Sequence, residues 1–429
     1  MMTRATGLAV CMAVLCGVLA GARGDLLPGT DATGRKPAGR ATWPGWRGPN
    51  RDGKSPDTGL LKAWPATGPR RLWTVTGLGH GFSSLTVVGN MIYTTGQVRR
   101  KLVLFGLDNT GEERWRVEIG PGFHKSAPGA RSTPTYDEGR LYLESGMGLV
   151  GCYDARTGKT IWTRKLSEFG GRVPQWGFAE SVLIAGEMAV VTPGGKSCIV
   201  ALNKKTGETV WQSPAFGGAQ YCSPIHITHR GLEMIVNGTR SGILGVHAES
   251  GKLLWKNRFA AGNTANCPTP ACVDGKVFWA TGYGKGGICL SLGGYTRAVA
   301  SVLWRSSHMD CKHGGFVIVD GHIYGNDGDG WTCLDLATGE KKWHEASVGR
   351  GSLCYADGML YLLGERGGKM ALVEATPEAY KQTGTGRVRG GGPAWAHPIV
   401  IGGKLYVRYD ERLYCFDVRD KKGAAAPRR

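Results

Sequence analysis

The sequence lacks the features that mark several common functional classes. It contains no C-x-x-C motif, no complete phosphate-binding loop and no recognisable Ser/His/Asp nucleophile context. Acidic residues are few, because 34 Asp and Glu stand against 53 Lys and Arg, which gives a net charge of +19. This balance favours an anionic neighbour. However, no dense basic run lies outside the chain ends and no nucleic-acid module is recognisable, so no nucleic-acid partner is expected.

Long hydrophobic runs are also scarce. The apolar stretch of residues 8–19 is too short for a comfortable membrane span, and it follows a basic Arg4 and precedes a small-x-small site at residues 20–22. We predict a signal peptide over 1–22, a linker over 23–42, a propeller over 43–418 and a basic tail over 419–429. A periplasmic or secreted protein without a transmembrane span follows from cleavage, and an uncleaved N-terminal anchor is the alternative.

Cysteine spacing gives no clear disulfide framework. Beyond Cys16 the cysteines are spread along the chain and mostly occupy positions where a small residue recurs. Export permits disulfides, but this spacing favours free buried thiols. Pairing of Cys267 with Cys272 is the alternative.

Glycine, in contrast, is abundant, and its 70 residues suit a fold with many tight turns. The most informative pattern is a phrase of a small residue, an apolar residue, an Asp-like residue, two variable residues, Thr-Gly, three variable residues and Trp. Its clearest copies begin at Cys152 and Cys333, and near copies begin at Ala201 and Gly245. Self-similarity at a period of about 40–50 residues indicates an array of supersecondary units.

Each unit consists of short apolar runs that alternate in polarity and are separated by Gly, Asp and Pro, which predicts β-strands. Four such strands at this period are typical of a β-propeller blade. Eight units can be counted. The last unit lacks a closing Trp strand, whereas the Trp strand near residues 69–76 has no unit before it. We therefore predict an all-β, eight-bladed propeller of four-stranded antiparallel blades, closed by the N-terminal strand in the last blade.

The residues of the phrase are predicted to be structural. Small residues should fit where neighbouring sheets press together, Thr-Gly should supply a turn, and the Asp-like residue should bond the backbone of that turn. Tryptophan should fill the gap between blades. The blade-packing positions are Trp73, Trp115, Asp154, Gly158, Trp162, Gly207, Trp211, Gly251, Trp255, Trp304, Asp335, Gly339 and Trp343.

The phrase resembles the tryptophan-docking motif of quinoprotein dehydrogenases, which carry pyrroloquinoline quinone (PQQ) in an eight-bladed propeller. Residues 43–418 resemble the secreted PQQ-binding-like repeat propellers of planctomycete-type bacteria, through residues 43–53, 313–325 and 351–361. They are also similar to the propeller lipoprotein of the outer-membrane barrel assembly machinery, which carries no cofactor. The dehydrogenases have an adjacent Cys-Cys pair and long insertions between blades, and this chain has neither. The resemblance therefore implies a scaffold.

Loops that join one blade to the next should gather at one mouth of the central channel. They supply His, Arg, amide and aromatic groups, which suit an anionic or carbohydrate-like ligand. The alternative is a solvated polar mouth without a ligand. The candidate rim residues are His80, His124, Lys125, Arg131, Arg172, Gln175, Trp176, Gln220, Tyr221, Asn263, Asn266, His308, Asp310, Lys312, His313, Arg350, Arg389, Trp395 and His397.

No metal site is expected from the rim. His308, Asp310 and His313 are the densest set of possible ligands, but alternate residues of an extended segment point in opposite directions. Residues 326–330 resemble a calcium loop only faintly and are predicted to form a hairpin turn.

These observations predict an exported, non-catalytic binding or scaffold propeller of the cell envelope. It is expected to be a monomer without a cofactor, and to recognise a protein, a glycan or another anionic ligand or lipid surface through the rim. The alternative is a PQQ-dependent dehydrogenase that oxidises an alcohol or a sugar, with PQQ and Ca²⁺. A carboxylate, an amide oxygen and an Arg or Lys beneath a Trp on the channel axis would favour that alternative.

Overall fold

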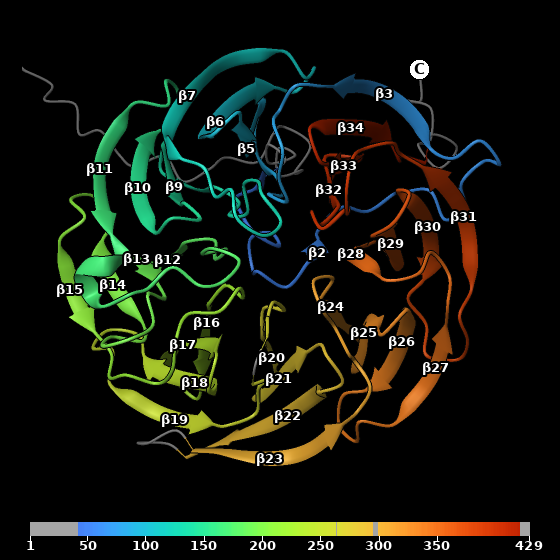
Figure 1. Cartoon of the computed structure of the whole chain (residues 1–429). Coiled ribbons are helices and arrows are strands. Elements are labelled where there is room, and N and C mark those ends of the chain that lie inside the picture. Colours follow the sequence, from blue (N-terminus) through green and yellow to red (C-terminus); the bar gives the residue numbers. More distant parts are fainter. Residues whose placement is uncertain (1–41, 263, 295–298, 421–429) are drawn as a thin grey trace, which may run out of the picture. The chain divides into compact units, whose positions relative to one another are not determined.

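The computed structural model describes residues 42–262, 264–294 and 299–420, so the predicted signal peptide and most of the predicted linker and tail lie outside the described residues. Within these ranges the chain forms eight sheets that follow one another around a central channel (Figure 1). The predicted eight-bladed propeller is therefore confirmed. No helix in the described ranges is long and apolar enough to cross a membrane.

The first four blades contain strands that follow one another in sequence from the channel outwards. Their bounds are β4 (Thr86–Val88), β5 (Met91–Val98), β6 (Lys101–Asp108) and β7 (Glu113–Pro121); β8 (Thr135–Asp137), β9 (Arg140–Glu144), β10 (Leu149–Asp154) and β11 (Thr160–Lys165); β12 (Leu183–Ala185), β13 (Met188–Val191), β14 (Val200–Asn203) and β15 (Thr209–Gln212); and β16 (Ile225–His229), β17 (Leu232–Thr239), β18 (Gly242–His247) and β19 (Leu253–Asn257). A 3₁₀-helix, η1 (Leu166–Phe169), follows β11.

The last four blades repeat this arrangement. Their bounds are β20 (Ala271–Val273), β21 (Lys276–Thr281), β22 (Gly286–Gly293) and β23 (Val299–Ser306); β24 (Phe316–Val319), β25 (His322–Asp327), β26 (Gly330–Asp335) and β27 (Lys341–Glu345); β28 (Gly351–Ala356), β29 (Met359–Gly364), β30 (Lys369–Glu374) and β31 (Gln382–Arg387); and β32 (Ile399–Ile401), β33 (Lys404–Tyr409) and β34 (Arg412–Asp417) with β3 (Arg70–Val75).

The N-terminal strand β3 closes the ring, as predicted, by pairing antiparallel with β34 so that Trp73 lies opposite Cys415. In Figure 1 the blue β3 accordingly lies outside the red β34. Two blades differ from the prediction because each gains a short inner strand from the N-terminal segment. β1 (Thr42–Trp43) pairs with β4, and β2 (Lys54–Ser55) pairs in parallel with β28. Both additional strands come from the segment that enters the channel.

The tryptophans of the repeated phrase fill the gaps between blades, as predicted. Trp162 lies opposite Cys152 in its own sheet, and its indole Nε1 donates a 3.0 Å hydrogen bond to the carbonyl of Lys204 in the next blade. A Cβ added to the turn residue Gly207 would lie 2.8 Å from the same indole. The glycine at the turn is thus required by the close approach of the preceding blade's tryptophan as well as by its φ of +78°.

The small residues of the phrase have a different role from the predicted one. A Cβ added to Gly106 would lie 2.3 Å from Trp115, and one added to Gly245 would lie 2.4 Å from Trp255. In both cases the tryptophan belongs to the adjacent strand of the same blade. The position is therefore small because the cross-strand indole lies over it, and not because a neighbouring sheet presses against it.

The Asp-like residues cap the turns of the phrase, as predicted. The Asp154 carboxylate accepts hydrogen bonds from the backbone N–H groups of Arg156 and Thr157, and from the Thr157 hydroxyl. These bonds, above all the one from the hydroxyl, lower the pKa of Asp154. Asp335 makes the equivalent bonds in the sixth blade.

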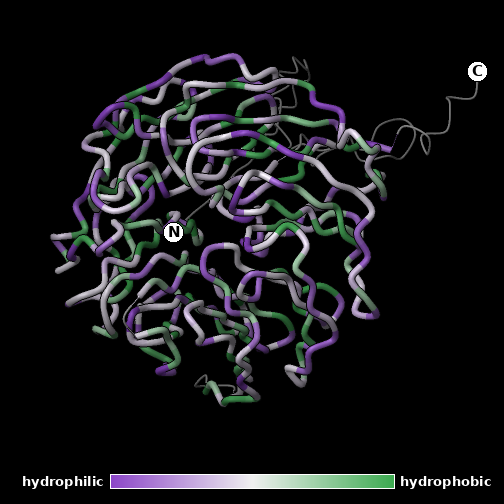
Figure 2. The backbone as a smooth tube through the Cα atoms, turned by 45° about the vertical axis from the view of Figure 1, so that its right-hand side comes forward, coloured by the Kyte–Doolittle hydropathy of each residue, from purple (hydrophilic) through white to green (hydrophobic). Residues whose placement is uncertain are grey.

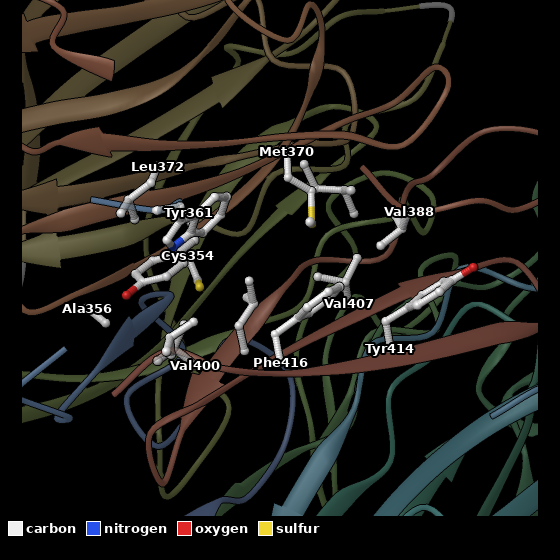
Figure 3. Close-up of a cluster of buried hydrophobic side chains, with 14 of the residues drawn as sticks. Cys354, Ala356, Tyr361, Met370, Leu372, Val388, Val400, Val407, Tyr414 and Phe416 are labelled. Carbon is white, nitrogen blue, oxygen red and sulfur yellow. The ribbon is translucent and has the colours of Figure 1, made fainter. Parts of the chain in front are cut away.

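Hydrophobic cores lie in the seams between neighbouring blades. Figure 3 shows part of the seam between the seventh and eighth blades, where Tyr361 and Leu372 face Val400 and Phe416. Trp64 packs into this seam on the path from the channel to β3. Because each blade buries residues on both faces, hydrophobic and hydrophilic stretches are interspersed around the ring and do not gather on one side (Figure 2).

Candidate functional site

Residues 42–55 occupy the central channel and are named here the axial plug. Its strands pair with the first and seventh blades, and β2 lies near the centre of the ring in Figure 1. The plug also contacts the six other blades. Pro44 accepts a 2.7 Å bond from the N–H of Tyr136 in the second blade, and the Trp46 ring lies 4.6 Å from that of His397 at the entrance to the eighth.

Two arginines and a tryptophan of the plug bind the remaining blades. Arg51 donates to the carbonyls of Ser181 at 3.0 Å and Pro224 at 2.8 Å, before the third and fourth blades. Trp46 Nε1 donates to Thr269 Oγ1 at 2.8 Å, before the fifth blade. Arg47 donates to the carbonyl of Phe316 in the sixth blade. The plug thus contacts every blade of the ring.

Burial lowers the pKa values of Arg47 and Arg51 to about 10, but both guanidinium groups remain charged at neutral pH. Both residues also take positive φ, 60° for Arg47 and 54° for Arg51, which is uncommon for residues other than glycine. The hydrogen bonds to the blades offset this local cost. Since so many contacts fix the plug, it forms a rigid floor within the channel.

Above the plug lies a cavity of about 350 Å³, named here the axial cavity. Its walls come from the loops between blades, from turns within blades, and from Trp46 of the plug. Six of its side chains are aromatic, and four more are basic or imidazole groups. The cavity residues are Trp46, Phe82, Ala127, Arg131, Trp176, Ala179, Tyr221, Ser223, Ala265, Cys267, Tyr283, Lys312, His313, Arg350 and Trp395.

The aromatic side chains of the axial cavity pack against one another. The His313 ring stacks on Trp395 with centroids 4.2 Å apart, and Phe82 contacts the same indole at 4.5 Å. Trp176 meets Tyr221 edge-on at 5.7 Å. The buried Nε1 of Trp395 and Nδ1 of His313 have no hydrogen-bond partner among the described residues. A polar ligand or water is the partner that such buried groups require.

The cations of the cavity differ in how firmly they are held. Arg131 is fixed by bonds to backbone carbonyls of its own loop, and burial lowers its pKa to about 10. Arg350 pairs with the exposed Asp329 at 2.7 Å, and the Lys312 ammonium lies 5.1 Å from the Tyr283 ring centroid. Burial, together with Arg350 and Lys312, lowers the pKa of His313 to about 4, so that imidazole is neutral at pH 7.

A second depression, named here the side groove, adjoins the axial cavity. It has a volume of about 810 Å³ and shares Trp176 and Tyr221 with the cavity. Its wall is rich in glycine and carries three cations, Arg172, Lys196 and Arg240. No described residue that lines the groove or the cavity is an Asp or Glu. Both sites are therefore electropositive.

The structure brings part of the predicted rim together. Arg131, Trp176, Tyr221, Lys312, His313, Arg350 and Trp395 line the axial cavity, whereas Arg172, Gln175 and Gln220 line the side groove. Asn263 lies outside the described residues. The others line neither site, namely His80, His124, Lys125, Asn266, His308, Asp310, Arg389 and His397.

Several of those other residues have structural partners. His80 is exposed and pairs with Asp410 at 3.0 Å. Asn266 is fully buried, where its side chain bonds Gln220 and Ala261. His397 is buried against the plug, and its Nδ1 has no hydrogen-bond partner within the described ranges. Burial, and to a lesser extent the charge of Arg47, lowers the pKa of His397 to about 3.

His308 and Asp310 belong to a small polar cluster in the sixth blade. His308 Nδ1 lies 3.2 Å from the Asp327 carboxylate, and that carboxylate also accepts the N–H of Asp310. Residues 328–329 form the hairpin turn between β25 and β26. No group of three or more His, Cys, Asp or Glu side chains that could hold a metal ion occurs within the described ranges.

The cysteines from Cys152 onward are free thiols. Cys267 and Cys272 are therefore not paired with each other. Cys267 lines the axial cavity, but burial raises its pKa to about 12. A thiol with such a pKa is not a nucleophile at neutral pH.

Sequence reasoning missed three aromatic residues of the axial cavity, namely Trp46, Phe82 and Tyr283. Trp46 belongs to the plug, and no repeat pattern indicates that this segment enters the channel. Tyr283 lies in the turn between β21 and β22. Because strands alternate in direction within a blade, turns between the second and third strands reach the same mouth as the loops between blades. Reading those turns would have found Tyr283, Lys196 and Arg240.

Two buried glutamates lie near each other in the second and third blades. Glu144 ends β9, and neither of its carboxylate oxygens has a hydrogen-bond partner among the described residues. Glu180 precedes β12 and accepts the N–H of Thr192 at 3.0 Å. Burial raises the pKa of Glu180 to about 8 and that of Glu144 well above its ordinary value. Neither side chain lines the axial cavity.

The family model that matches residues 99–345 is described as outer membrane protein assembly factor BamB. This match covers more than half of the sequence. The chain belongs to this family of PQQ-like β-propellers. Its blade-packing tryptophans and turn glycines are the residues that carry the repeat.

Proteins similar to this PQQ-like propeller include both alcohol dehydrogenases and BamB. The quinoprotein alcohol dehydrogenase PedH of Pseudomonas putida is 26% identical over 189 residues, which span 39% of this chain and 29% of that protein. BamB from Moraxella catarrhalis superimposes with a TM-score of 0.61 at 14% identity, over 81% of this chain and 99% of that one. The quinohemoprotein alcohol dehydrogenase of Comamonas testosteroni gives 0.63 at 12% identity, over 90% and 82%. These structural likenesses show the shared fold.

The axial cavity fits one part of a PQQ–calcium site and not the other. Its aromatic walls and cations suit a flat quinone that carries carboxylates. Calcium requires several oxygen ligands such as carboxylates and amide carbonyls. No Asp, Glu, Asn or Gln side chain is present among the described residues that line the cavity. The donor set therefore fits an organic anion and does not fit its calcium ion.

Proposed function

We propose that this propeller is an exported, non-catalytic binding protein whose axial cavity receives an anionic ligand with a flat or ring-shaped apolar face. The observation that carries the proposal is the composition of the cavity wall, which combines six aromatic side chains with Arg131, Lys312 and Arg350. Aromatic faces pack against rings, and cations pair with carboxylate, sulfate or phosphate groups. A volume of about 350 Å³ suits a small ligand or the end of a larger one.

The chemistry of the cavity favours binding over catalysis. A general base must lie within hydrogen-bond reach of the substrate, and its pKa should be near the working pH. The cavity residues offer no carboxylate, and His313, with a pKa of about 4, is a weak base. The rigid plug beneath the cavity supports a preformed site, since ligand binding need not order that floor.

Titration of tryptophan fluorescence tests this proposal, because Trp46, Trp176 and Trp395 line the cavity. The probes are galacturonate and PQQ, each with and without Ca²⁺. We expect saturable quenching that does not depend on Ca²⁺ and that Lys312→Gln weakens about tenfold, as the loss of one charge-assisted contact implies. Lys341→Gln, in the outer strand β27, is the matched control.

A second candidate function is a PQQ-dependent dehydrogenase. The observation in its favour is the aromatic and cationic cavity on the propeller axis, together with the similarity to PedH over part of the chain. Quenching by PQQ that requires Ca²⁺, with reduction of a dye by an alcohol or a sugar, would overturn the non-catalytic proposal. Absence of saturable quenching by either probe would overturn both.

A further inference from the structure

We infer that the side groove holds the chain of an acidic oligosaccharide whose terminal sugar occupies the axial cavity. This inference rests on the proposed function and specifies its ligand. The two sites share Trp176 and Tyr221, and neighbouring residues continue from one to the other, since Thr264 lines the groove and Ala265 lines the cavity. A ligand that enters the cavity therefore meets the groove as it leaves.

Size indicates that the ligand is longer than one ring. The groove has more than twice the volume of the axial cavity, about 810 Å³ against about 350 Å³. A single sugar ring fills only the cavity. The combined space suits several linked units, of which the first is enclosed by the aromatic walls.

Charge indicates that the chain is acidic. Arg172, Lys196 and Arg240 line the groove, and none of them forms an ion pair within the part of the chain that the structure describes. All three are exposed. Because no acidic side chain among the described residues lines the groove, a ligand with repeated negative charges is the partner that complements it.

The wall of the groove favours a glycan over a peptide. Its residues lie in loops, turns and η1, and none of them belongs to a named strand, so the groove offers no free strand edge for an extended peptide. The half-buried Trp176 ring at the junction can pack against the apolar C–H face of a sugar. Gly170, Gly195 and Gly218 carry no side chain that would fill the groove.

A ladder of oligogalacturonates from the monomer to the hexamer tests the inference by calorimetric titration. We expect the affinity of the unaltered chain to rise with length and to fall with added salt more steeply for the hexamer than for the monomer. Gly218→Phe should fill the groove without clashing with the protein, because a Cβ at this position meets no atom within 4 Å. It should remove the length dependence and leave the monomer affinity unchanged.

Gly293→Phe is the matched control. Gly293 ends β22 of the fifth blade, at the mouth of the ring opposite to the groove, and its added Cβ lies 3.9 Å from one backbone oxygen. It should bind every oligomer as the unaltered chain does. A second variant combines Arg172→Gln, Lys196→Gln and Arg240→Gln. Exposed ion pairs each change a binding constant by roughly twofold to fivefold. The combined variant should therefore lose about tenfold or more of the hexamer affinity.

The outcomes separate this inference from the proposed function. Equal affinity for oligomers of all lengths, together with monomer binding that Lys312→Gln weakens, would overturn the role of the side groove. The axial cavity would still be supported as the binding site. If the monomer does not bind, or if Lys312→Gln leaves the monomer affinity unchanged, the assignment of the axial cavity as a binding site would be overturned. Equal binding of neutral maltohexaose would refute the charge argument, and binding of polyglutamate without oligogalacturonate would replace the glycan by an acidic protein.

Discussion

Replacement of Arg51 with methionine tests whether the axial plug holds the ring together. Methionine has a similar length without the charge, so the variant leaves the carbonyls of Ser181 and Pro224 without their donor, whereas the Val182 carbonyl keeps the Thr135 hydroxyl. A hydrogen bond from a charged group contributes about 1.5–3 kcal/mol, and a buried acceptor without a donor costs about 1–3 kcal/mol. Removal of a buried charge recovers part of this through lower desolvation. We expect a net loss of roughly 3 kcal/mol.

Differential scanning calorimetry measures this loss as a lower Tm. With an unfolding entropy of about 2.1 cal/mol/K per residue, roughly 3 kcal/mol lowers the Tm of a propeller of this length by about 4 °C. Arg156→Met is the control, since Arg156 is exposed in a blade turn, and it should shift the Tm by less than about 1 °C. Equal shifts in both variants, or no shift in Arg51→Met, would refute the reasoning that the plug stabilises the ring.

Stability should also fall as the pH rises from about 4.5 to about 8. Burial in the folded state raises the pKa of Glu180 from 4.5 to about 8, so the folded state retains a proton that the unfolded chain releases over this range. Glu180→Gln should flatten the decrease in Tm between about pH 6.5 and 8, and an unchanged slope would contradict the assignment. Affinity for galacturonate should stay constant from about pH 8 to 6, because the pKa of His313 is about 4; a fluorescence titration with an inflection near pH 6.5 would disprove this. Gly158→Ala should destabilise by about 2–3 kcal/mol, because its Cβ would lie 2.8 Å from Trp115 and its φ is positive. Gly186→Ala shares the positive φ without a contact, so urea unfolding should show a smaller loss, and equal losses would exclude the tryptophan contact as the cause.

The fold could be predicted from the sequence because its determinants are local and repeat. Each blade carries its own turn, capping residue and tryptophan, so the pattern at Asp154, Gly158 and Trp162 recurs with the spacing of a blade. Closure of the ring was also predictable, since the unmatched strand at Trp73 and the incomplete last blade complement each other. The reason given for the small residues was incorrect, because the sequence does not show which of two adjacent sheets provides the contact.

The site was predicted only in part, because its residues come from segments that no local pattern connects. Loops between blades could be placed at one mouth by topology, and Trp176 and Trp395 do line the cavity there. The plug could not be placed, because residues 42–55 have no repeat and contact blades far away in sequence. The proximity of Glu144 and Glu180, in two different blades, likewise depends on packing between sheets.

The plug gives a physical reason why binding should occur at one mouth. Trp46 faces the axial cavity, whereas Arg51, Asp52 and Lys54 line a separate depression beside the turns of the fourth and fifth blades, on the opposite side of the channel. The depression on that side contains acidic as well as basic groups, so its charges partly compensate one another. Among the described residues, only the mouth above Trp46 combines aromatic walls with cations and has no acidic side chain in the lining of its cavity. A segment that closes the channel thus also separates an electropositive binding face from a mixed one, and a ligand selected by charge should approach from the first.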